Sequence, residues 1–240
     1  SPGSIFFALK GEHFDGNHFA LVSIEQGAAF AVVDDPTLPA HPQLLLVDSV
    51  LLTLQELAAH HRSLFSIPVV AITGTNGKTT TKELTQAILS KKFNTIATSG
   101  NLNNHIGVPL TLLRIGQDTE IAVIEMGANH PGEIDLLCRI AAPGSGLITN
   151  IGKAHLEGFG GFGGVIRTKT EMYRYLAKHG GMVFLHGADP LLREYASGIS
   201  TFTYGPPPAN LELVESTADP YVSATISASG VAFALQSNLY

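Results

Sequence analysis

Residues 69–84 read VVAITGTNGKTTTKEL, and this stretch decides the fold. Its first four residues are apolar, as in a buried strand, and they lead into a polar loop that contains Gly74 and Gly77. The loop ends at Lys78, where a helix is expected to begin. Glycines allow the tight turn, and the backbone N–H groups of such a loop and helix start attract anions. The stretch is therefore predicted to bind the phosphates of a nucleotide.

The loop differs from the common phosphate-loop pattern G-x-x-x-x-G-K-[ST], because Ile72 occupies the position of the first glycine. Lys78 is nevertheless expected to reach the β- and γ-phosphates, and the hydroxyl of Thr79 to bind Mg²⁺. An ordinary turn is the alternative, but a lysine at a helix start opposes the helix dipole. The predicted phosphate-binding residues are Gly74, Thr75, Asn76, Gly77, Lys78, Thr79 and Thr80.

The composition is that of a globular protein with buried strands. The 240 residues are 45% hydrophobic and 14% charged, which argues against disorder. The net charge of −6 argues against a general nucleic-acid surface. A single cysteine, Cys138, excludes an internal disulfide framework and suits a reducing cytosol. No apolar run reaches 18 residues, so no membrane-spanning helix is expected. We expect both chain ends to lie inside a longer protein.

Two units are predicted, with their boundary at Pro68. Residues 1–67 are expected to form a small α/β unit with strands over 5–9, 30–33 and 44–47 and helices over 17–27 and 53–64. Residues 68–240 alternate predicted strands (69–73, 94–98, 120–126, 146–151, 182–186) with predicted helices (78–91, 106–114, 131–141, 164–178, 189–197). This alternation indicates an α/β fold, a mostly parallel sheet with helices on both faces. Residues 199–240 are predicted to add a β-rich tail at the sheet edge.

Two polar residues follow later strands of the predicted sheet. Glu125 ends the strand 120–126, and a buried carboxylate there is costly unless a cation accompanies it. Since ligands bind at the carboxyl edge of an open α/β sheet, Glu125 is a candidate Mg²⁺ ligand, with a structural lysine or arginine as the alternative partner. His155 is predicted to lie at the same edge, although a single histidine is more often an ordinary surface or core residue.

Three further stretches are candidates for ligand contact. Asn101, Asn103 and Asn104 cluster after the second strand of the sheet and suit a hydrogen-bonding substrate, although a loop with helix caps would look similar. The glycine-rich run 158–164 is predicted to be a loop that either approaches a ligand or moves. Lys169 follows in the next helix, where an ordinary lysine would be solvated.

Together these motifs resemble the Mur ligases of peptidoglycan synthesis. The stretches that carry the resemblance are TGTNGKTTTKEL, GNLNNHIGVPLTLL, IEMGANHPGEI and TNIGKAHLEGFG, in that order over residues 73–160. The stretch SIFFALKGEHFDGNHFALVSIEQGAAFAVVDD is similar to the family's UDP-substrate domain. Within the family, IEMGANHPGEI and the asparagine-rich stretch are most like the ligases that add D-alanyl-D-alanine to UDP-N-acetylmuramoyl-tripeptide.

The resemblance implies a cytoplasmic, ATP-dependent amide ligase that works through an acyl phosphate. It implies one or two Mg²⁺ ions held by Thr79, Glu125, His155 and a carbamylated Lys169, and a catalytic set of Lys78, Glu125, His155 and Lys169. Asn101, Asn103 and Asn104 would orient the substrate, and Lys10, Gly11 and Asp15 are weaker candidates for the UDP end. A monomer is expected, with neither nucleic acid nor a membrane as partner. The family's third domain is expected outside this chain.

Other functions remain open from the sequence. Another Mur-type ligase, which adds the third residue, or a folylpolyglutamate-synthetase-like ligase would share the same ATP core. A non-catalytic nucleotide-binding module would need the loop but no convergence of Glu125, His155 and Lys169. A dinucleotide-binding domain is excluded, because no G-x-G-x-x-G follows the strand 69–73 and Lys78 would be unexplained.

Overall fold

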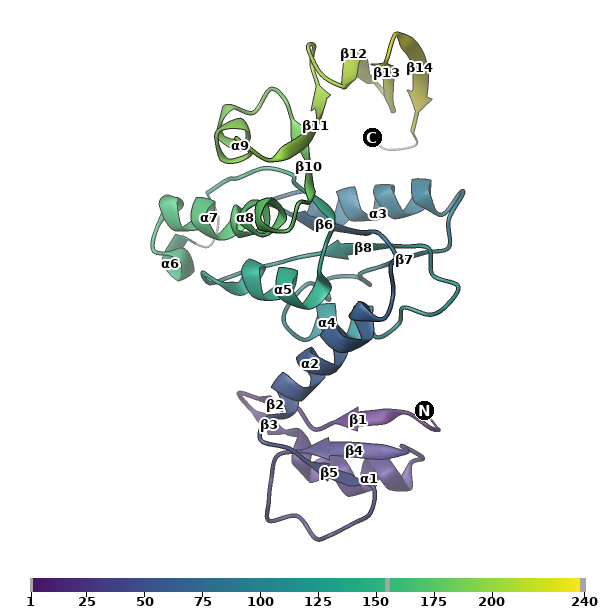
Figure 1. Ribbon diagram of the computed structural model, residues 1–240, viewed down its shortest axis with the longest axis vertical. Coiled ribbons are helices and arrows are strands. Elements are labelled where there is room, and N and C mark those ends of the chain that lie inside the picture. Colours follow the sequence, from purple (N-terminus) through teal and green to yellow (C-terminus); the bar gives the residue numbers. More distant parts are fainter. Residues whose placement is uncertain (1, 154–155, 238–240) are drawn as a thin grey trace.

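A computed structural model describes residues 2–153 and 156–237. Figure 1 shows three parts along the long axis of the molecule: a small α/β unit that contains the N-terminal end, a central unit, and an antiparallel sheet at the C-terminal end. In the described part of the chain, no helix is long and apolar enough to cross a membrane.

The small unit is built on three parallel strands. Its sheet has the order β1 (Ile5–Phe7), β4 (Phe30–Val33), β5 (Leu44–Leu46), and it is accompanied by the hairpin β2 (Lys10–Gly11) and β3 (Phe14–Asp15) and by η1 (Gly16–Phe19) and α1 (Ala20–Glu25). The helix predicted over 17–27 is therefore wrong at its start, which is a 3₁₀ turn. The side chain of Asp15 accepts from the N–H of Asn17 and begins this turn.

The large sheet has nine strands among the described residues. Their spatial order is β14 (Val231–Gln236), β13 (Val222–Ala228), β12 (Leu211–Ala218), β11 (Ser200–Gly205), β10 (Met182–His186), β9 (Ser145–Ile148), β6 (Val69–Thr73), β8 (Ile121–Glu125) and β7 (Thr95–Ala97). Neighbours from β7 to β12 pair in parallel, and β12, β13 and β14 pair antiparallel. The predicted parallel sheet with a β-rich tail is confirmed.

Helices cover the parallel part of this sheet on both faces (Figure 1). They are α2 (Val50–Ser63), α3 (Lys78–Leu89), α4 (Gly107–Leu112), α5 (Glu133–Ala141), α6 (Leu156–Phe159), α7 (Phe162–Lys169), α8 (Glu171–Lys178) and α9 (Pro190–Tyr195). Alternate residues of β6 separate the two cores: Ala71 belongs to the cluster with α2, α4, α5 and α8, whereas Ile72 belongs to the cluster under α3.

Three helix predictions need correction. Helix α5 begins at Glu133, two residues after Pro131, because Gly132 takes a left-handed φ of 86°. The helix predicted over 164–178 is two helices that meet at Thr170, whose hydroxyl bonds back to the carbonyl of Ile166. The glycine-rich run 158–164, predicted as a loop, is largely helical, since the end of α6 and the start of α7 lie within it.

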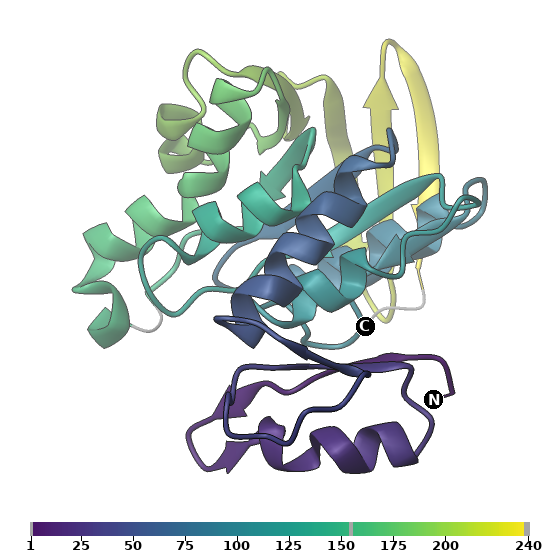
Figure 2. The ribbon, with the colours of Figure 1, turned by 60° about the horizontal axis from the view of Figure 1, so that its bottom comes forward.

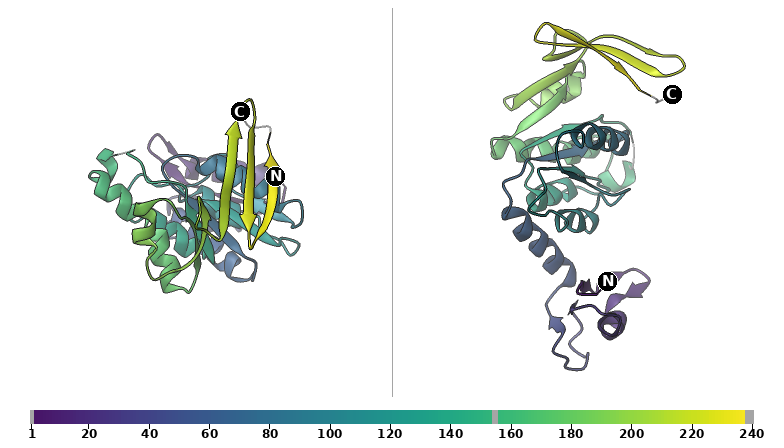
Figure 3. Two further views of the ribbon diagram at one scale, coloured as in Figure 1. Left: turned by 90° about the horizontal axis from the view of Figure 1, so that it is seen from above. Right: turned by 90° about the vertical axis from the view of Figure 1, so that its right-hand side faces the viewer.

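Helix α2 belongs to both cores. Val50, at its start, packs in the core of the small unit, and Ala58 packs in the core of the central unit. Figure 2 shows the helix running from one unit to the other, and the right-hand view of Figure 3 shows it as the link along the long axis. The relative position of the two units therefore depends on this helix.

Candidate functional site

The predicted phosphate loop joins β6 to α3 at the carboxyl edge of the sheet. Gly74 has φ 147° and Gly77 has φ 76°, backbone conformations that side chains rarely adopt. A Cβ atom on Gly74 would collide with the hydroxyl of Thr149. Gly77 is the N-cap of α3, so the first N–H groups of the helix, those of Lys78, Thr79 and Thr80, have no intrahelical acceptor and are available to an anion.

The segment after β9 holds this loop in place through hydrogen bonds. The N–H of Thr75 donates to the carbonyl of Asn150 (2.9 Å). The side-chain amide of Asn150 bonds both backbone groups of Asn76, accepting from its N–H (3.1 Å) and donating to its carbonyl (3.0 Å). The hydroxyl of Thr149 donates to the same carbonyl (2.6 Å). The backbone N–H groups of Thr75 and Asn76 therefore shape the loop, and the helix start is left to meet phosphate.

Sequence reasoning did not find Thr149 and Asn150 as site residues. Both lie directly after β9, and their side chains were part of the quoted stretch TNIGKAHLEGFG. Their position at the carboxyl end of a predicted parallel strand could have indicated a role in the site, because polar side chains there lie near the phosphate loop.

Two lysines, Lys78 and Lys169, line the same cavity near the loop. The ammonium of Lys78 donates to the carbonyl of Thr75 (3.1 Å), so this side chain folds back over the turn. Lys169, at the end of α7, is only 4% exposed. Burial, the larger cause, and the charge of Lys78 together lower the pKa of Lys169 to about 8. Lys169 is therefore not an ordinary solvated lysine.

Glu125 ends β8 and is fully buried. One carboxylate oxygen, Oε1, accepts from Asn103 Nδ2 (2.7 Å) and from the hydroxyl of Thr79 (3.3 Å). The other, Oε2, is buried without a hydrogen-bond partner, and no salt bridge to Glu125 forms within residues 2–153 and 156–237. A buried carboxylate oxygen without a partner is costly, and a cation would offset that cost.

The asparagine segment serves as a loop and as part of the site. Asn103 bonds Glu125 through its side chain and accepts from the N–H of Gly127 through its carbonyl (2.8 Å). Asn104 is a helix cap, because its side chain accepts from the N–H of Gly107 (2.9 Å). The loop-and-cap alternative is therefore present at Asn104, and contact of this segment with a substrate stays a prediction.

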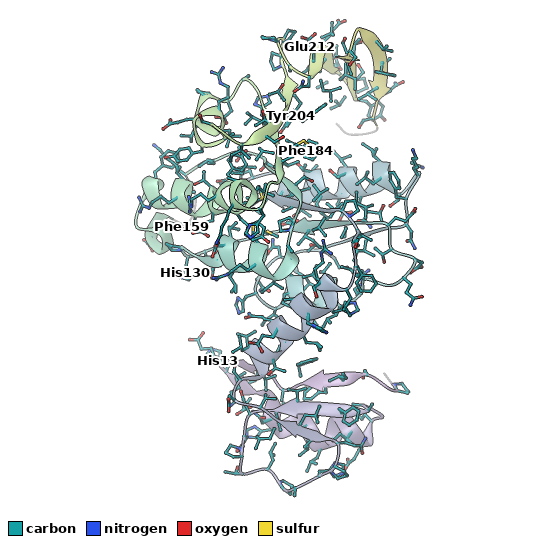
Figure 4. The ribbon with its side chains drawn as sticks, viewed as in Figure 1. His13, His130, Phe159, Phe184, Tyr204 and Glu212 are labelled. Atoms are coloured by element: carbon teal, nitrogen blue, oxygen red, sulfur yellow. The ribbon has the colours of Figure 1, made fainter. Side chains whose placement is uncertain are left out.

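A cavity of about 420 Å³ brings most of these residues together. Its walls are Gly74, Thr75, Lys78, Asn101, Asn103, Asn104, His105, Gly127, Ala128, Asn129, Glu133, Leu137, Phe159 and Lys169. Glu125 is joined to this wall by its hydrogen bond from Asn103, and Thr79 is joined to Glu125. Figure 4 labels two residues on this side of the central unit: Phe159 of α6, and His130, just before α5.

Helix α5 presents its N-terminus to this cavity. Glu171 accepts from the N–H groups of Gly132 (2.8 Å) and Asp135 (2.9 Å), which caps α5 from the start of α8. Glu133 accepts from the N–H groups of Asn129 (2.6 Å) and His130 (3.0 Å). Burial opposes ionisation of Glu133, but these two amides prevail and lower its pKa. Two carboxylates that the sequence did not single out thus shape the cavity wall.

Some predicted site residues lie elsewhere. Lys10, Gly11 and Asp15 belong to the hairpin of the small unit and do not line the cavity. The ammonium of Lys10 forms an ion pair with Asp34 (2.9 Å). The prediction for His155 lies outside the described residues. Within those residues, no group of three His, Cys, Asp or Glu side chains is placed so that it could hold a metal ion. The predicted metal ligands include two residues of these types, Glu125 and His155, and the structure describes Glu125 alone of the two.

At this edge of the sheet, a polyphosphate can bind to the N-terminus of α3 and to Lys78, and a cation can bind to the buried Glu125. This arrangement defines a nucleotide-binding α/β domain of the phosphate-loop class. Residues 72–235 match the Mur ligase middle domain. The chain belongs to the Mur ligase family, as its motifs predicted.

Two curated relatives carry the same description, UDP-N-acetylmuramoyl-tripeptide–D-alanyl-D-alanine ligase. The one from Bacillus subtilis (strain 168) is 43% identical over 204 residues, which are 84% of this chain and 44% of the relative. The one from Escherichia coli (strain K12) is 47% identical over 180 residues, 75% of this chain and 40% of the relative. The chain thus spans less than half the length of these relatives.

Solved structures agree in fold. MurF from Acinetobacter baumannii superposes with a TM-score of 0.89 at 34% identity, over 99% of this chain and 53% of that one. MurF ligase from Thermotoga maritima in complex with ADP gives 0.87 at 33% identity, over 98% and 55%. Folylpolyglutamate synthase from Mycobacterium tuberculosis, at 13% identity and a TM-score of 0.57, shares the fold alone.

Proposed function

We propose that this chain is the phosphate- and metal-binding part of an ATP-dependent amide ligase. The ligase joins D-alanyl-D-alanine to UDP-N-acetylmuramoyl-tripeptide and releases ADP and phosphate, and it acts in the cytoplasm as a monomer, with neither nucleic acid nor a membrane as partner. The observation that carries this proposal is the buried Oε2 of Glu125, which has no hydrogen-bond partner among the described residues and lies beside Thr79 and the phosphate loop. It supports a cation site next to the phosphates, which the ligase chemistry requires.

The first step is transfer of the γ-phosphoryl group. A carboxylate oxygen of the tripeptide substrate attacks the γ-phosphorus, the bond to the bridging oxygen of ADP breaks, and an acyl phosphate forms. The N–H groups of Lys78, Thr79 and Thr80 bind the phosphate oxygens at the start of α3, and the ammonium of Lys78 leaves the carbonyl of Thr75 to offset their charge.

The residues around Glu125 fit a Mg²⁺ ion. Thr79 and Glu125 offer the hydroxyl and carboxylate oxygens that Mg²⁺ prefers, and Oε2 of Glu125 has no other partner among the described residues. A bound Mg²⁺ would neutralise charge on the β- and γ-phosphate oxygens. Lys169 is proposed as a carbamate that, with His155, holds a second ion. Its lowered pKa of about 8 supports this, because the neutral amine is the form that reacts with carbon dioxide.

The substrate is held on the other side of the cavity. Asn101, Asn103 and Asn104 line it with amide groups that bind and orient the peptide. In the second step the amine of D-alanyl-D-alanine attacks the acyl carbon, the amide bond forms and phosphate leaves. Lys10, Gly11 and Asp15 stay proposed for the UDP end, although Asp34 already neutralises Lys10.

The test is ADP release by the protein that carries this chain, with Mg-ATP, UDP-N-acetylmuramoyl-tripeptide and either D-alanyl-D-alanine or single amino acids. We expect release with the dipeptide only, and none after Lys78→Ala. Lys91→Ala, an exposed lysine just beyond the end of the same helix, is the matched control and should keep full activity. Release with a single amino acid and a shorter acceptor would identify a sister ligase. No release with any donor would overturn the ligase and favour a binding module.

A further inference from the structure

Helix α2 is fastened to the central unit by side chains that reach distant backbone carbonyls. Gln55 Nε2 donates to the carbonyl of His105 (3.0 Å), the ring of His61 bonds the carbonyl of Ile115 (2.9 Å), and Arg62 Nε donates to the carbonyl of Ala141 (3.0 Å). These bonds join residues 50 to 79 positions apart in the sequence. The linking helix therefore moves with the central unit.

Of these three bonds, only that of Gln55 reaches a residue of the cavity wall. His105 lines the cavity directly after Asn103 and Asn104, and Gln55 is only 9% exposed. The asparagine segment, residues 101–105, is held in its middle by the bond from Gly127 N–H to the carbonyl of Asn103. Gln55 holds its far end, just before α4 begins at Gly107.

The start of α2 touches the polar cluster of the small unit. The N–H of Val50 donates to Asp34 (3.4 Å), the carboxylate that also pairs with Lys10 and bonds the buried Asn17. Val50 and Gln55 lie five positions apart in the first half of this 14-residue helix, so a short stretch of α2 joins that cluster to the asparagine segment. A helical stretch of this length, about 7.5 Å, is stiff, so a shift of Val50 is transmitted to Gln55.

We propose that Gln55 is a positioning residue, which fixes the asparagine segment so that its amides meet the substrate in a preset geometry. That the segment binds the substrate rests on the proposed function; that Gln55 fixes the segment does not. Loss of this one half-buried hydrogen bond leaves the His105 carbonyl without that donor and lets the segment sample other positions. Binding must then order it again, which is expected to weaken substrate binding about five- to tenfold.

The test compares Gln55→Leu with a matched control, His61→Leu, which removes a similar bond from the same helix to a carbonyl outside the cavity wall. The first measurement is amide hydrogen exchange of the chain without ligand. We expect Gly107 and Val108, whose N–H groups bond Asn104, to exchange about tenfold faster in Gln55→Leu and at the normal rate in His61→Leu. Unchanged exchange in Gln55→Leu would overturn the proposal.

The second measurement is steady-state kinetics of the protein that carries the chain. In Gln55→Leu the KM for UDP-N-acetylmuramoyl-tripeptide is expected to rise five- to tenfold, with the KM for ATP and kcat unchanged. An equal rise in both KM values, or the same rise in His61→Leu, would show a general loss of structure and overturn the proposal. If the unaltered protein has no ligase activity, the proposed function fails, and hydrogen exchange alone decides the role of Gln55. Gln55→Met, which keeps the side-chain length, replaces Gln55→Leu if that variant does not fold.

Discussion

Replacing Lys169 by methionine is expected to stabilise the protein near neutral pH. Lys169 is 4% exposed, and its pKa falls from the ordinary 10.5 to about 8 because of burial first and the charge of Lys78 second. The difference of about 2.5, at about 1.4 kcal/mol per pKa unit, gives a cost of about 3 kcal/mol for folding with this lysine charged. Methionine fills a similar volume without that cost.

The sign of the pH dependence follows from proton binding. Between pH 8 and 10.5 the unfolded chain holds the proton of Lys169 and the folded chain does not, so stability rises with pH in this window. The cost is fully present below pH 8. At pH 10 only about 1 kcal/mol of it remains, so the advantage of Lys169→Met should shrink by about 2 kcal/mol between pH 7 and pH 10.

The assay is urea unfolding of both proteins at pH 7, 8, 9 and 10, without Mg²⁺ and in buffer freed of carbon dioxide. Because both proteins share every other titrating group, the difference between their free energies of unfolding isolates Lys169. Lys178→Met, at an exposed lysine that ends α8, is the control and should show no such trend. A difference that stays flat from pH 7 to 10, or a destabilised Lys169→Met at pH 7, would refute the electrostatic account of this residue.

Three further substitutions probe the site and the linking helix. Asn150→Ala removes two bonds to the backbone of Asn76, at about 1 kcal/mol each, so calorimetric titration should find ATP bound up to about thirtyfold more weakly; unchanged affinity would mean that the loop keeps its shape unaided. Gly74→Ala sets a side chain against Thr149 at φ 147° and should abolish ATP binding with the circular dichroism intact. Arg62→Met strips donors from four buried or half-buried backbone carbonyls and should lower the free energy of unfolding by about 3 kcal/mol, measured in urea; a loss under 1 kcal/mol would contradict this.

Local patterns were enough to predict most of the architecture. The strands at 30–33, 69–73 and 182–186 were predicted with the bounds they have, because short, mostly apolar runs bounded by turn residues favour buried strands. The errors fell where a single backbone conformation decides a boundary. Gly132 delays the start of α5, and Thr170 divides one predicted helix into two. Neither effect leaves a periodic signal.

The glycine-rich run was misjudged for a different reason. Glycine is a poor helix former in isolation, so a loop was predicted over 158–164. In the structure these glycines permit close packing: a Cβ on Gly158 would press on the carbonyl of Asn129, and one on Gly164 would collide with the carbonyl of Phe159. Tertiary contacts of this kind override propensity, and they are invisible without the neighbouring segment.

The sequence by itself determined that a strand, a glycine turn and a lysine-led helix form a phosphate loop, because those residues follow one another along the chain. It also placed Glu125 at the carboxyl edge of the same sheet. Only the tertiary structure decided what surrounds them. It brought Asn150 onto the loop, left one oxygen of Glu125 without a hydrogen-bond partner among the described residues, buried Lys169 near Lys78 and set Gln55 against His105. Hydrogen bonds and burial depend on which distant segments meet in space, and no local pattern records that.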